Sequence, residues 1–418
     1  MLTRLKKIYN EFPGLFWIVV GTLFIDAIGS TLLFPFFALY ITQKFNVGMT
    51  EAGILLGMSS LFGLIGSLVG GALTDRFGRR RLILFGLVFS GLSSLSFGLA
   101  GEIRILYFLV IFVGLLSRVA GPAYDAMLAD IVPEAQRQEA FGITRVAYNY
   151  AWILGTALGG FIAARSFLAL FIIDAALSLL VALILYRFLP ETQPAAHSEA
   201  RRHESLLQTA AGYRFVLRDL GYMAFTLAGM IVLIVYQQQY SSLPVYLWDV
   251  HNIDSRSYGI MLSISGLEVV LFQIWVSRTI RRWPPFLMMA LGSLFFTAGF
   301  AMIGFVRGFT FFALAVVIAT IGEMILFPTN KALAVNFAPE DMRGRYMAVY
   351  DLGWTIPATI GPAAAGVILD NYNPNLLWYL GGILCAVAAA AFYALHLRLG
   401  AQRRFAPERP EEDIPAAP

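Results

Sequence analysis

Long apolar runs separated by polar turns recur along nearly all of this 418-residue sequence. A helix rises about 1.5 Å per residue, so roughly 20 apolar residues suffice to cross the ~30 Å hydrocarbon core of a bilayer. The runs have this length, and the sequence therefore predicts helices that span a membrane. We place twelve of them at about 14–41, 50–74, 82–100, 105–131, 140–164, 167–188, 220–246, 257–279, 285–305, 309–336, 345–369 and 376–397.

The composition supports a polytopic membrane protein. Hydrophobic residues make up 58% of the chain and charged residues 13%, whereas about a quarter of the residues in soluble domains are charged. The single Cys385 excludes a disulfide framework or a thiolate metal cluster, and no histidine falls in the middle of a predicted span. We therefore expect no metal site and no cofactor. Basic residues are spread over alternate loops, which argues against a nucleic-acid partner.

The distribution of Lys and Arg predicts how the chain crosses the membrane. One set of alternate loops contains most of the basic side chains, and the other set contains only Lys44, Arg104, Arg165, Arg256 and Arg307. Basic loops remain on the cytoplasmic side. We therefore expect a multi-pass protein of the plasma (inner) membrane with both termini in the cytoplasm.

One long polar loop follows Pro190 and divides the apolar runs into two groups of six. We predict an N-terminal six-helix bundle at 1–190, a cytoplasmic linker at 191–218 and a C-terminal six-helix bundle at 219–400. The tail at 401–418 is rich in Pro, Ala and charge, which predicts a disordered cytoplasmic segment.

The two halves repeat each other with a displacement of 206 residues. Val132-Pro133-Glu134 matches Ala338-Pro339-Glu340 at that spacing. The same displacement pairs several residues that shape helices, namely Gly53 with Gly259, Pro122 with Pro328, and Gly155 with Gly361. One register across several predicted helices indicates that the second six spans are a copy of the first six.

A basic turn joins the second and third predicted spans. Its sequence is Gly71-Ala-Leu-Thr-Asp75-Arg76-Phe-Gly78-Arg79-Arg80-Arg81. The arginines would anchor the turn on the cytoplasmic side, and Gly71 and Gly78 would permit close approach and a sharp reversal. Asp75 can hold the following helix by a charge-assisted hydrogen bond.

This turn resembles the G-x-L-x-D-R-x-G-R-[KR] signature of the major facilitator superfamily. Gly155-Thr156-Ala-Leu-Gly159-Gly160 also resembles the Gly-Pro-x-x-Gly-Gly pattern of drug:proton antiporters, with Thr156 where that pattern has proline. The resemblance implies an all-α integral membrane protein with 12 transmembrane helices in two pseudo-symmetric six-helix bundles, which is the major facilitator fold. We expect it to act as a monomer.

Four charged side chains are predicted near the middle of the membrane, where an ionised group costs at least about 2.5–3.5 kcal/mol. They are Asp26, Arg118, Glu268 and Glu323. In the fold that this sequence resembles, Arg118 can form an ion pair with Asp26. The pair is either fixed and structural or part of the binding site. Glu268 and Glu323 then have no basic partner and can take up protons or bind a cation. A structural, protonated carboxyl is the alternative for both, and we favour a structural role for Asp174.

Four further charges in the inner third of the membrane follow the repeat. Asp125 and Lys331 are 206 positions apart, as are Arg145 and Asp351. They can form an inner gate that pairs across the two halves. Alternatively, they pair within each half, Asp125 with Arg145 and Lys331 with Asp351, and only brace the helices.

Aromatic and amide side chains complete a predicted pocket. We select Gln237, Gln238, Tyr148 and Trp354 as candidate binding residues, because aromatic rings can hold cations through their faces. Contact with lipid or with other helices is the alternative for each ring. Gln237 to Gln239 occupy three faces of one helical turn, which predicts that the seventh helix is broken or unwound there.

These features favour a secondary active exporter that exchanges protons for lipophilic or cationic compounds. A carrier of lipids or small metabolites on the same fold is the alternative. Its partners would be a small-molecule substrate, protons and the lipid bilayer. The sequence contains no G-x-x-x-x-G-K-[ST] loop and no H-E-x-x-H motif, so we do not predict an enzyme.

Overall fold

The computed structural model describes residues 9, 11–117, 120–190, 213–339, 342–402 and 405, and only the backbone of residues 68–77, 122 and 135. These residues contain helices and no strand. Eleven of the described helices are long and apolar enough to cross a membrane. A twelfth crossing consists of the shorter helices α6 and α7, so the predicted all-α fold with twelve crossings is confirmed.

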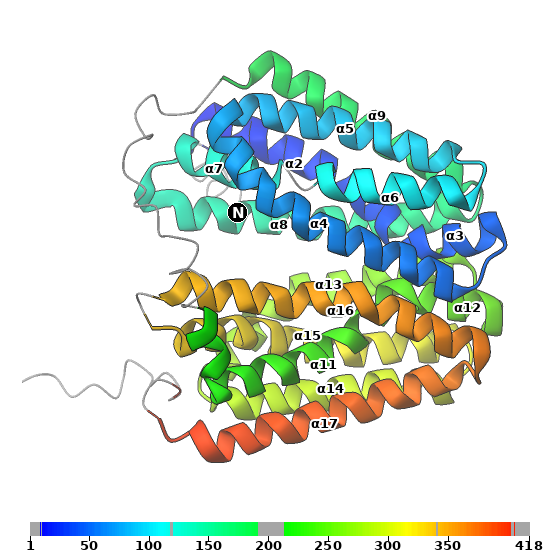
Figure 1. Cartoon of the computed structure of the whole chain (residues 1–418), viewed down its shortest axis with the longest axis vertical. Coiled ribbons are helices and arrows are strands. Elements are labelled where there is room, and N and C mark those ends of the chain that lie inside the picture. Colours follow the sequence, from blue (N-terminus) through cyan, green and yellow to red (C-terminus); the bar gives the residue numbers. More distant parts are fainter. Residues whose placement is uncertain are drawn as a thin grey trace, which may run out of the picture. The chain divides into compact units, whose positions relative to one another are not determined.

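Two compact units divide the chain. The first consists of Met1–Ala200 together with Asp254–Gly266. Its main elements are α2 (Gly14–Leu33), η1 (Phe34–Phe36), α3 (Phe37–Phe45), α4 (Met49–Phe77), α5 (Arg79–Leu99), α6 (Ile103–Ser117), α7 (Gly121–Ile131), η2 (Glu134–Gln136), α8 (Arg137–Ala163) and α9 (Phe167–Phe188) (Figure 1).

The second unit consists of Arg201–Ile253 and Leu267–Pro418. Its helices are α11 (Leu220–Ser241), α12 (Leu243–His251), the later part of α13 (Ser255–Ile280), α14 (Pro285–Phe305), α15 (Phe309–Phe337), α16 (Arg343–Asn371) and α17 (Asn375–Leu399). In this unit α14 and α17 pack along each other (Figure 1).

The repeat found in the sequence sets the helix boundaries. Asn46 and Asn252, which are 206 residues apart, end α3 and α12 in the left-handed conformation, with φ of 52° and 54°. Asn tolerates this conformation better than most residues. Six helices of the first unit begin 206 residues before their counterparts: 14 and 220, 37 and 243, 49 and 255, 79 and 285, 103 and 309, and 137 and 343.

Two predicted spans are interrupted within the described residues. The first changes to a 3₁₀ turn at Phe34–Phe36, which contains Pro35. The fourth is described as α6 and α7, and residues 118–119 between them lie outside the described residues. The expectation that the seventh span breaks at Gln237–Gln239 is wrong, because α11 continues to Ser241. Only Ser242 separates α11 from α12, which begins at Leu243-Pro244, where proline cannot donate a hydrogen bond to the preceding turn.

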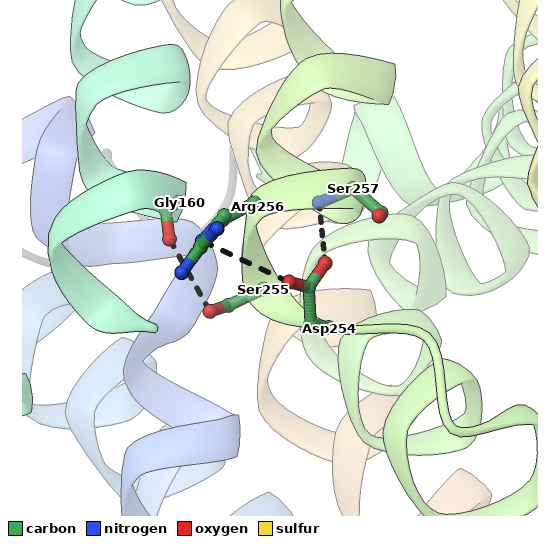
Figure 2. A network of polar contacts seen from close by, with 5 residues as sticks. All are labelled: Gly160, Asp254, Ser255, Arg256 and Ser257. Atoms are coloured by element: carbon green, nitrogen blue, oxygen red, sulfur yellow. Dashed lines mark hydrogen bonds and ion pairs between the residues drawn. The ribbon is translucent and has the colours of Figure 1, made fainter. Parts of the chain in front are cut away.

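The first turn of α13 packs tightly against α8 within the first unit. An added Cβ at Gly160 would lie 3.1 Å from the Cα of Gly259, so both helices need glycine here. Figure 2 shows the polar contacts around this turn: Ser255 Oγ donates to the Gly160 carbonyl at 3.3 Å, and the Ser257 amide donates to Asp254 Oδ1 at 2.9 Å.

The predicted linker and tail fall mostly outside the described residues. Residues 191–212 and 406–418 are among those not described, whereas 213–218 are helical. Within the tail, Phe405 is 1% exposed, and its ring meets Phe286 at the start of α14 edge to face and Phe337 at the end of α15 at a tilt. Phe405 is an aromatic residue in an otherwise polar segment, so the composition of the tail gave no indication of this contact.

Candidate functional site

A chain of hydroxyl groups leads to a carboxyl group inside the second unit. Tyr236 on α11 hydrogen-bonds to Glu323 on α15, and the hydroxyls of Tyr236 and Tyr240 lie 3.0 Å apart. A tyrosine has a single O–H proton. When Tyr236 donates it to Glu323, Tyr240 must donate to Tyr236. The two tyrosines face the same side of α11 because they are four residues apart.

Aromatic rings form a connected row that begins at Tyr236, the hydrogen-bond partner of this carboxyl group. The ring of Tyr236 meets Phe327 edge to face at 4.8 Å between centroids, and Phe327 lies 5.1 Å from Trp354 on α16. Phe327 is one helical turn after Glu323, so ring and carboxyl lie on one face of α15. The predicted candidate Trp354 is therefore connected to Glu323 through Phe327.

Glu268 on α13 lies close enough to Glu323 for their charges to interact. Its Oε2 atom is buried and has no hydrogen-bond partner among the described residues. In the described part of the second unit, no basic side chain contributes to the electrostatic environment of either carboxyl group. The structure thus brings together two of the acids that the sequence selected.

The two candidate glutamines have different surroundings. Gln238 is buried, and its amide donates to the Ile234 carbonyl at 2.7 Å, while its oxygen accepts from Ser241 and Ser242 at 3.1 Å and 2.8 Å. Its side chain thus stabilises the junction of α11 and α12. Gln237 is half-buried, and its side chain makes no hydrogen bond to a described residue.

In the first unit, Asp26 lies at a pocket on α2. Its Oδ1 accepts a hydrogen bond from Ser178 on α9 at 3.0 Å. A pocket of about 370 Å³ opens beside it, lined by Leu23, Asp26, Ala27, Ser30, Thr144, Arg145 and Tyr148. Asp26, Tyr148 and the gate candidate Arg145 therefore lie around one space. The predicted partner Arg118 lies outside the described residues.

Asp174 is buried where α9 packs on α2, beside Ser94, whose hydroxyl donates to the Phe171 carbonyl at 3.2 Å. A Cβ at Gly29 would lie 2.5 Å from Asp174 Oδ1, so glycine is required for the carboxyl group to fit between the helices. The charges of Asp174 and Asp26 are close enough to interact. This environment agrees with the structural role favoured for Asp174.

The four gate candidates are all exposed. Within the first unit, neither Asp125 nor Arg145 forms an ion pair with a described residue. In the second unit, Lys331 attracts Asp351 electrostatically, although no ion pair between them is formed within 4 Å. A brace made of direct ion pairs within each half is therefore absent from this part of the chain.

The basic turn is sharper than the sequence suggested. Helix α4 continues to Phe77, α5 begins at Arg79, and only Gly78 separates them with φ of +87°, a conformation that favours glycine. The backbone of Gly71, Asp75 and Arg76 belongs to α4, but the side chains of Asp75 and Arg76 are not among the described atoms. The hydrogen bond expected from Asp75 to the following helix is therefore outside the described part of the chain.

Two arginines of the turn hold the start of α5. Arg79 forms an ion pair with Asp130 near the end of α7. Arg80 donates to the Tyr186 carbonyl on α9 at 2.7 Å, and its guanidinium lies 5.4 Å from the centre of the Tyr186 ring. These contacts join three helices of the first unit at the turn.

We expect the Arg79–Asp130 pair to stabilise the first unit by about 1 kcal/mol, because both side chains are only partly exposed. A double-mutant cycle with Arg79→Gln and Asp130→Asn, followed by thermal unfolding in detergent, measures this coupling. Arg81→Gln is the control, since Arg81 is exposed at the same turn. Additive effects of the two substitutions would contradict the pairing.

Reasoning from the sequence did not connect Tyr236, Phe327 and Ser178 to the acids. The spacing of four residues between Glu323 and Phe327, and between Tyr236 and Tyr240, was the available signal. No spacing in the sequence indicates which side chains from different helices contact each other. No group of three or more His, Cys, Asp or Glu side chains able to hold a metal ion occurs among the described residues.

A family model described as Major Facilitator Superfamily matches residues 19–356 and 239–418. The chain belongs to the Major Facilitator Superfamily. It is therefore a multi-pass membrane transporter of small molecules and not an enzyme, which confirms the family and class predicted from the sequence.

Two curated members of the superfamily are similar along most of the chain. The Na(+), Li(+), K(+)/H(+) antiporter of Planococcus maritimus is 28% identical over 82% of this chain and 87% of its own. The quinolone resistance protein NorA of Staphylococcus aureus (strain MSSA476) is 23% identical over 88% of this chain and 94% of its own.

A solved structure of a membrane transporter has the same fold. The nucleoside transporter NupG superposes with a TM-score of 0.80 at 12% identity, over 91% of this chain and all of NupG. At this identity the similarity concerns the fold alone.

Proposed function

We propose that the chain is a proton-coupled secondary active transporter that exports lipophilic or cationic compounds by alternating access. The observation that supports this proposal is the environment of Glu323. Its carboxyl group has a tyrosine hydroxyl, aromatic rings and a second carboxyl group as neighbours, and no described basic residue of its unit compensates its charge.

Electrostatics explains why this arrangement suits ion exchange. Two carboxylates in a low-dielectric site repel each other, so a proton or a bound cation must neutralise at least one of them. A proton and a cationic substrate therefore compete for the same charge. Competition for Glu323, with Glu268 beside it, is the simplest physical basis for antiport.

The aromatic rings favour an organic cation. Rings attract cations through their faces, by about 0.5–1 kcal/mol at exposed sites and about 2 kcal/mol or more when desolvated. Tyr236, Phe327 and Trp354 form a connected row beside Glu323. The similarity to NorA, a quinolone resistance protein, is consistent with export of such compounds.

An alkali cation is the second candidate substrate. The groups connected to Glu323 supply oxygen atoms: the Tyr236 hydroxyl, the Tyr240 hydroxyl through it, and the Glu268 carboxyl group. Hard cations prefer oxygen ligands. The Na(+), Li(+), K(+)/H(+) antiporter of Planococcus maritimus supports this candidate.

Transport into proteoliposomes with an imposed pH gradient tests the proposal. We expect accumulation of a lipophilic cation such as tetraphenylphosphonium that stops when a protonophore collapses the gradient. Parallel assays with Na⁺ and K⁺ distinguish the second candidate. Transport that is indifferent to the protonophore would reject proton coupling for either substrate.

We further propose that Asp125, Arg145, Lys331 and Asp351 form an inner gate. The proposal is supported by their exposure and by the absence of direct ion pairs within each half among the described residues. A cysteine pair at positions 125 and 331 is then expected to crosslink when the transporter is locked outward-facing. Crosslinking between 125 and 145, with none between 125 and 331, would favour the brace.

We propose that both termini lie in the cytoplasm and that the protein lies in the plasma (inner) membrane. The excess of Lys and Arg in alternate loops supports this orientation. We propose a monomer of two six-helix bundles at 1–190 and 219–400. Labelling of single cysteines at Lys44 and Arg281 from either side tests the orientation.

A further inference from the structure

The second unit contains a histidine that the proposed transport site does not use. His251 is the last residue of α12. Its ring meets the ring of Tyr246 at 4.9 Å between centroids, and the ring of Phe312 near the start of α15 at 4.8 Å. Both of these aromatic residues are buried. The imidazole is therefore packed in an aromatic corner that joins the end of α12 to α15.

The aromatic corner is fixed from α17. The Tyr246 hydroxyl donates to Asn375 Oδ1 at 2.7 Å, and the ring of Tyr246 lies 5.2 Å from the ring of Trp378. Asn375 and Trp378 belong to the first turns of α17. Tyr246 thus anchors the middle of α12, and His251 extends this anchorage to the last turn of the helix.

The surroundings of His251 suit a neutral imidazole better than a charged one. Its Nε2 atom is buried and has no hydrogen-bond partner among the described residues, although the residue as a whole is only partly buried. A proton can therefore reach the side chain from solution, but an N–H group at Nε2 would lack an acceptor. Burial, and then the positive charge of Arg307, lower the pKa of His251 below its ordinary value of about 6.5.

No described carboxylate offsets this cost. Asp249 on α12 interacts electrostatically with Asp370 near the end of α16, and neither acid contributes to the environment of His251. Arg307, in the turn between α14 and α15, is the one described charge that acts on the imidazole. The charged and titratable groups around this corner are Arg307, Asp249, Asp370, Tyr246 and Tyr379.

We propose that His251 is a pH switch: the neutral ring holds the end of α12 against α15, and the protonated ring leaves the aromatic corner. Histidine is the side chain whose charge ordinarily changes between pH 5 and 8. In the proposed topology the α12–α13 turn faces the outside, so the switch responds to the external pH. It does not depend on proton exchange at Glu323.

The direction of the response follows from linkage. The packed arrangement favours the neutral imidazole, so it loses stability as the pH falls below about 6.5. The ratio of released to packed protein then rises by up to about tenfold per pH unit, until the pH reaches the lowered pKa of the packed form. Above about pH 7 the switch leaves the packing unchanged.

Hydrogen–deuterium exchange of the full-length protein in nanodiscs, followed by mass spectrometry, tests the switch. Exchange of segment 243–253 is compared between wild type and His251→Phe at pH 7.5 and at pH 5.0, so the intrinsic pH dependence of exchange cancels at each pH. Phenylalanine keeps a ring in the corner but takes up no proton. We expect equal exchange at pH 7.5 and about tenfold faster exchange in the wild type at pH 5.0.

Two further variants separate the charge from the packing. Arg307→Gln keeps the histidine and removes the positive charge that acts on it. The pKa of the packed form then lies closer to the ordinary value, so the response to acid should be smaller than in the wild type. His396→Phe changes a histidine at the other end of α17 and should retain the full response.

Equal exchange of segment 243–253 in wild type and His251→Phe at pH 5.0 would overturn the proposal. A response in Arg307→Gln as large as that of the wild type would contradict its electrostatic origin. The same comparison in a Glu323→Gln background should give the same tenfold difference. Failure of proton-coupled transport and failure of the switch are therefore observed separately.

Discussion

Glu323→Gln is expected to reduce transport driven by a pH gradient to background. Glutamine has nearly the same shape and can still accept a hydrogen bond from Tyr236, so the helices should pack as before. It cannot lose a proton or provide a negative charge to a cation. Uptake of tetraphenylphosphonium into proteoliposomes, with equal amounts of correctly folded protein, measures the effect.

Two controls make the Glu323→Gln result specific. Tyr236→Phe removes the hydrogen-bond donor but not the acid, so partial activity is expected. Glu102→Gln changes an exposed carboxyl group in the loop before α6 and should leave transport unchanged. Wild-type rates in Glu323→Gln under the same gradient would show that another group carries the proton.

Gly155→Ala is expected to destabilise the first unit by about 2 kcal/mol relative to a matched glycine substitution. A Cβ at this position of α8 would overlap Thr31 Oγ1 and lie 3.0 Å from both the Ile28 carbonyl oxygen and the Leu32 amide nitrogen of α2. The threonine hydroxyl could rotate away, but the two backbone atoms can move only if the helices separate. Thermal unfolding in detergent measures the loss.

Gly142→Ala is the matched control for Gly155→Ala. It lies on the same helix, and a Cβ there would meet no atom within 4 Å. Both substitutions gain about 1 kcal/mol of helix propensity, so the difference between them isolates the contact between α2 and α8. Equal unfolding temperatures for the two variants would mean that the helices adjust without cost.

The architecture could be predicted because it depends on patterns that are periodic in the sequence. The length of apolar runs predicted the twelve crossings. The displacement of 206 residues recurs in the starts of α8 and α16 at Arg137 and Arg343, which lie a few residues before the predicted starts at 140 and 345. Breaks within a crossing were harder to predict. Gln237 to Gln239 are polar but remain helical, since Gln238 satisfies its amide within its own helix and the next junction.

The candidate site was only partly predictable. Glu268 and Glu323 stood out because a charge in an apolar run is costly, and the structure places them close to each other. Their neighbours depend on which faces of α11, α13 and α15 meet, and a single sequence does not determine those faces. The partner of Arg79 was unpredictable for the same reason, because Asp130 lies 51 positions away on another helix.

The exchange of a proton for a cation at Glu323 can be measured without a membrane. Purified protein in weakly buffered detergent, titrated with tetraphenylphosphonium in the presence of a pH-indicator dye, should release protons in proportion to bound cation. The release should vanish in Glu323→Gln and persist in Glu102→Gln. Binding of the cation to wild-type protein, observed by calorimetry, without release of protons would contradict the proposed competition.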